Sequence, residues 1–126
     1  MTRPLICVIE DYADSRVLIT TVLTRAGMDV VTAEDGRALD ALLTDGQTPS
    51  LFLIDLSLPG ENGTSILRRL RLNLRFTGTP MVALTAHAMA GDAERGLAAG
   101  FDDYVTKPID IAALPSRLRA LLTAAA

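Results

Sequence analysis

The chain has 126 residues, 49% of them hydrophobic, which is enough for one folded domain with a core of its own. The formal net charge is −3, from 15 acidic and 12 basic residues, so the chain has no overall positive field to attract nucleic acid. Its aromatic residues are three Phe and two Tyr, too few for a surface on which bases stack. We therefore expect no direct contact with nucleic acid.

The single cysteine and the N-terminal sequence indicate where the protein works. Cys7 lies within the apolar run "LICVI" and has no second cysteine with which to form a disulfide inside the chain. A reducing compartment suits such a residue. The N-terminus lacks the apolar segment and cleavage site of a signal peptide. A membrane helix needs about 18 consecutive apolar residues, and no apolar run in the sequence is that long. These features predict a cytoplasmic protein that does not enter a membrane.

Short apolar segments alternate with helix-like segments along the chain. The predicted strands are residues 5–9, 28–33, 51–55, 81–85 and 103–106. The helix-like segments that follow them are residues 14–27, 34–46, 63–74, 91–100 and 110–122. Apolar strands that alternate with helices are typical of a parallel sheet covered on both sides. The predicted fold class is therefore α/β, a doubly wound (βα)5 sandwich with a five-stranded parallel sheet and helices on both faces.

Capping residues and a proline mark the ends of two helices. Asp14 is the predicted N-cap of the first helix, and Gly27 is the predicted left-handed residue after its end. If Asp110 caps the last helix, Pro115 lies just past the first turn, where proline removes a backbone hydrogen bond. The last helix is therefore expected either to begin near Leu114 or to be kinked at its start.

Carboxylates follow two of the predicted strands at the point where each strand ends. Glu10 and Asp11 come directly after the first strand, and Asp55 ends the apolar run "LFLID" of the third. In an open parallel sheet, ligands bind at the carboxyl ends of the strands, so these three acids are expected to converge. Three neighbouring carboxylates repel one another. A divalent cation such as Mg²⁺, which prefers oxygen ligands, would relieve that repulsion.

A hydroxyl and an ammonium group end two further strands. Thr85 ends the fourth predicted strand, and Lys107 follows the fifth. A compact ammonium suits a phosphoryl oxygen, and aspartate is a known covalent phosphoryl acceptor. Metal and lysine together would neutralise the charge of an in-line phosphoryl transfer. Each of these residues alone fits an ordinary turn, cap or solvated side chain. Their coincidence at several strand ends is what favours a metal and phosphate site.

Four short motifs, spread over nearly the whole chain, resemble those of the receiver domain of two-component response regulators. They are the acidic pair "ED" at 10–11, the segment "DLSLPGENG" with the pattern D-x-x-x-P-x-x-x-G, "ALTAH", and "DDYVTKP". Each motif alone is weak, and their shared order and intervals make the resemblance specific. It implies the strand order 2-1-3-4-5, which the chemotaxis member of this family exemplifies.

The resemblance also implies roles for individual residues. Asp55 matches the family's phosphoacceptor, and Lys107 matches its phosphate-contacting lysine. Thr85 matches the switch hydroxyl, and Tyr104 matches the switch aromatic residue. The peptide bond between Lys107 and Pro108 is expected to be cis. The implied switch is a movement of Thr85 toward the phosphate, which frees space for Tyr104 to turn inward.

The cofactor implied by the resemblance is Mg²⁺, or Mn²⁺ in its place. Its ligands would be the side chains of Glu10, Asp11 and Asp55 and the backbone carbonyl of Ser57. Position 10 is Glu where Asp is also common in the family, and the longer side chain is expected to alter metal affinity without abolishing function. Ser57 and His87 occupy positions that influence how fast water removes the phosphoryl group. For His87, an exposed loop imidazole without such a role is the alternative.

The function implied is that of a signalling module with self-catalysed phosphoryl transfer and autodephosphorylation. A phosphohistidine on a histidine kinase or a histidine phosphotransfer protein would donate the phosphoryl group to Asp55. A downstream protein would then bind the surface formed by the fourth helix, the fifth strand and the fifth helix. We expect residues 1–126 to form one receiver domain without an output domain, monomeric or weakly dimeric. It would be a stand-alone regulator or part of a longer hybrid kinase.

Two enzymes from other classes compete with the receiver hypothesis. A phosphatase of the aspartyl-phosphate type usually carries a second acid two residues after its nucleophile, where this chain has Ser57. A dinucleotide-binding enzyme would have a glycine-rich first turn, where this chain reads "EDYADS". Turnover of an added phosphomonoester would support the phosphatase, and stable binding of NAD would support the dinucleotide-binding enzyme.

Overall fold

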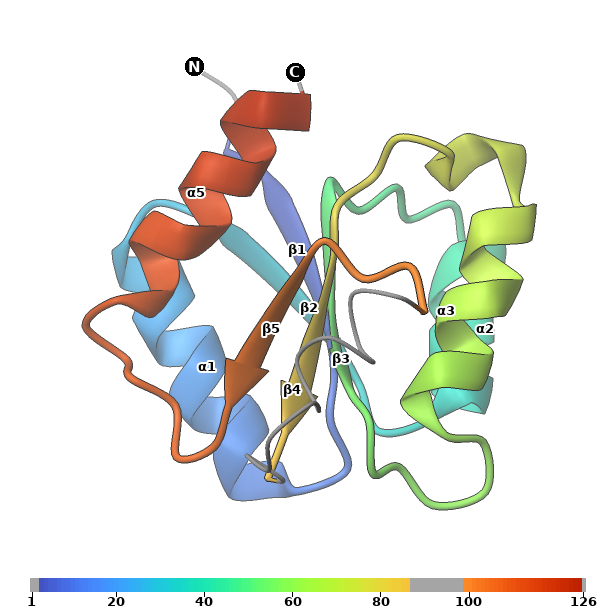
Figure 1. Cartoon of the computed structure of the whole chain (residues 1–126), viewed down its shortest axis with the longest axis horizontal. Coiled ribbons are helices and arrows are strands. Elements are labelled where there is room, and N and C mark those ends of the chain that lie inside the picture. Colours follow the sequence, from blue (N-terminus) through green and yellow to red (C-terminus); the bar gives the residue numbers. More distant parts are fainter. Residues whose placement is uncertain (1–2, 87–98, 126) are drawn as a thin grey trace.

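A five-stranded parallel sheet forms the centre of the computed structural model, which describes residues 3–86 and 99–125 (Figure 1). The strands are β1 (Leu5–Ile9), β2 (Asp29–Ala33), β3 (Leu51–Asp55), β4 (Met81–Thr85) and β5 (Asp103–Thr106). They lie in the order β2-β1-β3-β4-β5, and every neighbouring pair is parallel. The predicted strand order is confirmed. The predicted helix over 91–100 falls almost wholly outside the described residues.

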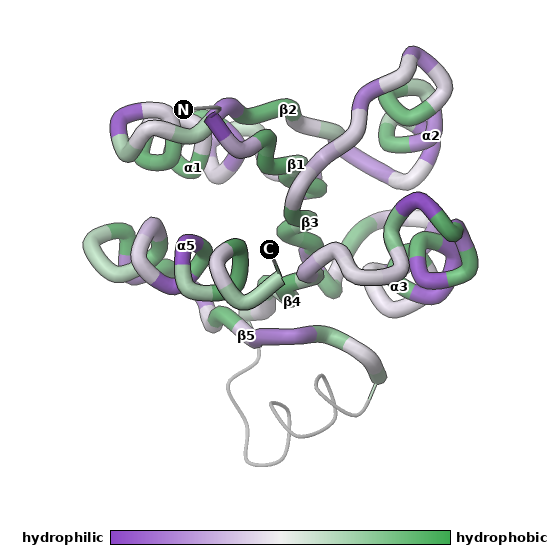
Figure 2. Tube along the Cα trace, turned by 90° about the horizontal axis from the view of Figure 1, so that it is seen from above, coloured by the Kyte–Doolittle hydropathy of each residue, from purple (hydrophilic) through white to green (hydrophobic). Residues whose placement is uncertain are grey.

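Helices cover both faces of the sheet, as predicted for a doubly wound α/β fold. They are α1 (Ala13–Arg25), α2 (Gly36–Thr44), α3 (Gly63–Leu72) with a 3-10 turn at Leu74–Phe76, and α5 (Leu114–Ala125). The view in Figure 2 shows α1 and α5 on one side of the strands and α2 and α3 on the other. None of the helices in the described part of the chain combines the length and the apolar character that crossing a membrane requires.

Alternate residues of each strand pack on opposite faces, so the sheet separates two hydrophobic clusters. In β1, Ile6 and Val8 contact the side covered by α1 and α5, whereas Cys7 and Ile9 contact the side covered by α2 and α3. All four side chains are fully buried. Two-sided burial explains why the central strands read as continuous apolar runs rather than as alternating patterns. It also leaves the strand ends as the place where polar side chains meet.

The first helix begins differently from the prediction. Asp14 is not its N-cap: α1 starts at Ala13, and Tyr12 is the capping residue, without a side-chain hydrogen bond to the helix. The backbone N–H of Arg16 donates to the carbonyl of Tyr12 at 3.1 Å, so the first turn of the helix begins closer to the N-terminus than predicted. Asp14 lies in that turn, where a carboxylate is favourable to the helix dipole, and accepts from the Tyr12 hydroxyl. The predicted left-handed residue Gly27 has φ +93°.

The last helix takes the first of the two predicted forms. The Asp110 carboxylate accepts hydrogen bonds from the backbone N–H groups of Ala112 and Ala113, and the Asp110 carbonyl accepts from Ala113 and Leu114. These bonds form a separate turn, after which α5 begins at Leu114. Pro115 is thus in the first turn of α5, where its missing N–H has no intrahelical partner to lose.

The structure predicts that the single cysteine is inert in the folded protein. Cys7 is fully buried in the middle of β1, and burial raises the pKa of its thiol from 9.0 to about 12. Because the thiolate is the reactive species, we expect almost no reaction with a colourimetric disulfide reagent at pH 8 in native buffer. In guanidinium chloride, one thiol per chain should react promptly. Prompt reaction without denaturant would contradict this burial.

Candidate functional site

Three carboxylates meet at the carboxyl edge of the sheet. The pairing of β1 with β3 sets Ile9 beside Ile54, so Glu10 and Asp55 follow at neighbouring positions. One carboxylate oxygen from each of Glu10, Asp11 and Asp55 lies within 4.8 Å of the others. Glu10 is 1% exposed and Asp55 3% exposed, whereas Asp11 faces solvent. The convergence expected from the strand ends is therefore present in the fold.

An ammonium group joins two of these carboxylates. The Nζ of Lys107 lies 2.7 Å from Oε2 of Glu10 and 3.0 Å from Oδ2 of Asp55. The backbone N–H of Lys107 donates to the Thr85 carbonyl at 2.7 Å, which fixes the end of β5 against β4. The peptide bond between Lys107 and Pro108 is cis. Lys107 thereby reaches across from β5 to the ends of β1 and β3.

Burial and neighbouring charges have opposite effects on the pKa values of this cluster. Burial raises the pKa of Glu10, the Lys107 ammonium lowers it, and the neighbouring Asp55 carboxylate raises it again, so the result is above the ordinary value. Burial by itself would lower the pKa of Lys107, but its two carboxylate partners outweigh burial and raise that pKa. Lys107 therefore stays charged at neutral pH. One ammonium facing three carboxylates leaves the cluster with an excess of negative charge.

The donor set fits a hard divalent cation. Mg²⁺ binds through one or a few carboxylates and keeps several waters, which suits two buried acids beside one that faces solvent. The remaining negative charge of the cluster would be neutralised by such an ion. The backbone N–H of Ser57 donates to Oδ1 of Asp55 at 2.8 Å and orients that carboxylate. Glu10, Asp11 and Asp55 are thus the side chains that would hold the ion, and the Ser57 carbonyl stays a predicted ligand.

The two predicted switch residues lie on the same face of the sheet. In the pairing of β4 with β5, Ala83 is beside Tyr104 and Thr85 is beside Thr106. Residues two apart in a strand share a face, so Thr85 and Tyr104 are on the side covered by α2 and α3. Thr85 is 2% exposed, and the Tyr104 ring is partly buried against that cluster. His87, the other predicted tuning residue, lies outside the described residues.

The segment after β3 is packed against the backbone of Asp55. A Cβ atom at Gly63 would lie 2.4 Å from the Asp55 carbonyl oxygen, so only glycine fits where α3 begins. The Gly63 N–H donates to the Leu56 carbonyl at 3.3 Å, and the Asn62 side chain caps α3 by accepting from Ser65. These contacts explain the glycine of the D-x-x-x-P-x-x-x-G pattern. They hold the backbone that carries Asp55 rigidly.

One residue at the site was not predicted from the sequence. Arg16, in the first turn of α1, donates from Nη1 to the backbone carbonyls of Glu10 at 2.8 Å and Asp11 at 2.9 Å. The available signal was an arginine that follows the acidic pair by five residues, at the start of a helix. Sequence patterns do not distinguish such an arginine from the solvated arginines elsewhere on the helices.

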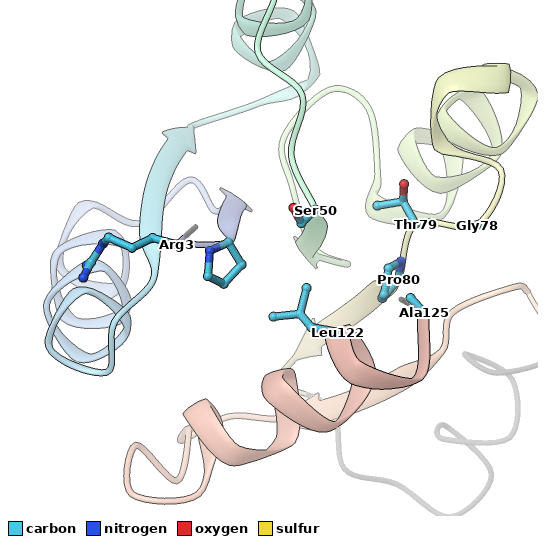
Figure 3. Close-up of a pocket in the computed structure, with 8 residues that line it drawn as sticks. Arg3, Ser50, Gly78, Thr79, Pro80, Leu122 and Ala125 are labelled. Atoms are coloured by element: carbon cyan, nitrogen blue, oxygen red, sulfur yellow. The ribbon is translucent and has the colours of Figure 1, made fainter. Parts of the chain in front are cut away.

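A hollow of about 580 Å³ lies at the opposite edge of the sheet (Figure 3). It is lined by Arg3, Pro4, Ser50, Gly78, Thr79, Pro80, Leu122 and Ala125, several of which precede the amino ends of strands. Its cation is already engaged, because Arg3 pairs with Asp29 at 2.8 Å and donates to two backbone carbonyls. Because the arginine is the lining residue that carries a charge and it is already paired, the described lining of the hollow has no free charge to bind an ion, and the acidic edge is the candidate site.

Fold, strand-end acids and lysine together define a phosphoacceptor signalling domain, and comparison with known proteins agrees. The family model of the response regulator receiver domain matches residues 6–119. The chain is 34% identical to the phosphate regulon transcriptional regulatory protein PhoB of Pseudomonas aeruginosa, over 97% of this chain and 53% of that protein. It is 38% identical to the transcriptional regulatory protein PhoP of Escherichia coli K12, over 93% of this chain and 51% of that protein.

A solved structure gives the same result. The receiver domain of the Francisella response regulator 1452 superposes with a TM-score of 0.88 at 29% identity, over 98% of this chain and all of that one. The chain belongs to the response regulator receiver domain family. It spans about half the length of the curated relatives it matches. The membership confirms the resemblance read from the motifs and gives no support to the phosphatase alternative.

Proposed function

We propose that Asp55 is the residue that accepts the phosphoryl group in this receiver domain. The observation that carries the proposal is its carboxylate, 3% exposed at the end of β3, with Oδ2 on the Lys107 ammonium and Oδ1 on the Ser57 N–H. A carboxylate held by two fixed donors is oriented for attack and needs little reorganisation. An Asp55 oxygen would bond to phosphorus as the bond between phosphorus and the donor's leaving group breaks.

The other side chains of the cluster would support this transfer. Mg²⁺ or Mn²⁺, when bound, supplies positive charge to the phosphoryl oxygens. Glu10, Asp11 and Asp55, with the Ser57 carbonyl, would hold the ion. Lys107 would release part of its contact with Glu10 and pair with a phosphoryl oxygen, and the Thr85 hydroxyl would donate to another. The self-catalysed loss of the phosphoryl group to water would be tuned by Ser57 and His87.

Phosphorylation would be read out on the β5 side of the sheet. Thr85 and Tyr104 lie on one face of neighbouring strands, which supports a coupled movement in which Thr85 approaches the phosphate and Tyr104 turns inward. Such a movement is a two-state element biased by a local change of charge. A downstream protein would bind the surface formed by β5, α5 and the segment between β4 and β5.

The partners follow from the family and the chemistry. The phosphoryl donor would be a phosphohistidine on a histidine kinase or a histidine phosphotransfer protein. Neither nucleic acid nor membrane is needed for this step, and the domain would act in the cytoplasm as a monomer or a weak dimer. Because the curated relatives are about twice as long, the chain would serve either alone or as one part of a larger protein.

Intact-mass spectrometry tests the proposed chemistry. The chain incubated with acetyl phosphate and Mg²⁺ should gain the mass of one phosphoryl group. The gain should disappear when the divalent ion is removed with EDTA, and it should return with Mn²⁺. Peptide mapping after borohydride reduction should place the modification on Asp55. A phosphoryl group on another residue, or a gain that does not depend on the ion, would overturn the proposal.

A further inference from the structure

The acidic pair at the end of β1 is tied to α1 by a single side chain. Nη1 of Arg16 donates to two consecutive backbone carbonyls, at 2.8 Å for Glu10 and 2.9 Å for Asp11. One nitrogen that bridges two successive carbonyls fixes the direction of the peptide unit between them. The backbone that carries both acids is thereby held to the first turn of the helix.

The place of Arg16 on the helix makes this contact informative. Arg16 is in the first turn of α1, and helical side chains extend toward the N-terminus. A positive charge at that end is unfavourable to the helix dipole. The two carbonyls compensate for this by accepting charge-assisted hydrogen bonds, which are stronger than those between neutral groups. These two hydrogen bonds therefore explain why the arginine side chain lies against the loop that carries the acids, although its charge is near the N-terminal end of a helix.

The two acids depend on Arg16 to different degrees. Glu10 has other anchors, because its N–H donates to the Ala33 carbonyl and its carboxylate accepts from Lys107 and from the Tyr12 N–H. Asp11 is exposed, and within residues 3–86 and 99–125 its side chain makes no hydrogen bond. Among the described residues, the bond from Arg16 to the Asp11 carbonyl is the hydrogen bond that Asp11 itself makes, and its neighbours Glu10 and Tyr12 have further bonds. Loss of the bond from Arg16 would loosen the least constrained of the three acids.

We propose that Arg16 is a positioning residue for the divalent-cation site, holding the backbone of Glu10 and Asp11 so that both carboxylates face Asp55. The inference rests on the proposed function, because it assumes that these acids bind an ion. It does not assign Arg16 any contact with ion or phosphate. Residues that orient metal ligands commonly change metal affinity by about 10- to 100-fold when they are substituted.

Two effects of Arg16 on the ion have opposite signs, which makes the test decisive. The guanidinium charge repels a cation, so its removal by itself would strengthen metal binding. Loss of the two hydrogen bonds would loosen Asp11 and weaken metal binding. A positioning role therefore predicts weaker binding for a neutral variant, and a purely electrostatic role predicts tighter binding.

Mn²⁺ titrations followed by the EPR signal of the free ion measure this directly, without phosphorylation. We expect Arg16→Gln to weaken Mn²⁺ binding by about tenfold and Arg16→Lys to weaken it less. Arg25, on the last turn of the same helix and remote from the acids, provides the matched control, and Arg25→Gln should bind like the wild type. In an Asp11→Ala background, Arg16→Gln should have a smaller effect than in the wild type, because the ligand it positions is absent.

The outcomes separate the two proposals. Wild-type binding with unchanged or tighter binding by Arg16→Gln would overturn the role of Arg16 and leave the metal site intact. No binding by the wild type would overturn both. Circular dichroism melting of each variant without metal checks that it is folded at the titration temperature. If Arg16→Gln is unfolded, Arg16→Met, which also lacks the guanidinium donors, carries the test, and unaltered affinity in that variant would then overturn the inference.

Discussion

Asp55→Asn is expected to abolish phosphoryl acceptance and, without a divalent cation, to make the domain more resistant to unfolding. A carboxamide is not a nucleophile toward phosphorus at neutral pH, so the loss should be complete. The gain in stability follows from the crowding of Asp55 and Glu10 around one Lys107 ammonium. A neutral side chain of the same shape removes a buried charge and the repulsion of Glu10 while keeping hydrogen-bonding atoms. We expect about 1 kcal/mol of added stability.

Intact mass with acetyl phosphate and urea denaturation measure the two effects on the same sample. Asp45→Asn is the control for loss of one exposed carboxylate, because Asp45 is exposed at the C-terminal end of α2. It should be phosphorylated like the wild type and gain only a few tenths of a kcal/mol, from relief of the helix dipole. Mg²⁺ should stabilise the wild type more than Asp55→Asn, since the variant lacks one ligand. A phosphorylated Asp55→Asn protein would disprove the assignment of the acceptor. Lower stability would mean that the Lys107 contact outweighs the repulsion between the acids.

Lys107→Met is expected to lower both stability and the rate of phosphorylation. The substitution leaves the buried carboxylates of Glu10 and Asp55 without their ammonium partner. We expect a loss of about 2 kcal/mol at pH 7, less than for a fully buried pair because the Lys107 side chain is 24% exposed. Loss of one positive donor to the phosphoryl oxygens should slow the reaction with acetyl phosphate by about a hundredfold.

The stability deficit of Lys107→Met should depend on pH with a defined sign. In the folded wild type, burial already raises the pKa of Glu10 above its ordinary 4.5, and removal of the opposing Lys107 raises it further. An acid with a raised folded-state pKa stabilises the fold most when protonated, and this stability is lost as the pH rises through the folded pKa. The deficit should therefore shrink as the pH falls toward 4.5.

Urea denaturation at several pH values tests this, with Arg37→Met on the exposed face of α2 as the control for loss of one positive charge. Mg²⁺ should restore more stability to Lys107→Met than it adds to the wild type, because the ion supplies the missing positive charge. A deficit that is constant from pH 7 to the acid range would show that it does not arise from the unpaired charge of Glu10.

The sheet and its acidic edge could be predicted from the sequence for one physical reason. Strands buried on both faces must be apolar throughout, so a carboxylate such as Asp55 marks the place where a strand leaves the core. The same reasoning predicts that Glu10 and Lys107 lie at the carboxyl edge of the sheet, beside Asp55. Resemblance to the family then added roles that spacing alone left open, including those of Thr85 and Tyr104.

Details that depend on competition between neighbouring groups could not be predicted. Asp14 is a residue type that commonly caps helices, but the cap lies two residues earlier, at Tyr12, because the Tyr12 carbonyl accepts from the Arg16 N–H. The start of α5 was left between two forms, since a turn from Asp110 and a kink at Pro115 satisfy the same sequence. The contact of Arg16 with the acidic pair could not be predicted, because its side chain bonds to backbone carbonyls, which every residue type carries.

The double ion pair of Lys107 has a consequence for amine chemistry. Lys107 is the only lysine in the sequence, so its Nζ is the only side-chain amine that can react with an acylating reagent. Amines react in their neutral form, and the raised pKa of Lys107 keeps that form scarce while both carboxylates are in contact. Acylation at this nitrogen therefore reports whether the ion pairs are made. The domain has an intrinsic reporter of its own site, and no tag or introduced residue is needed to use it.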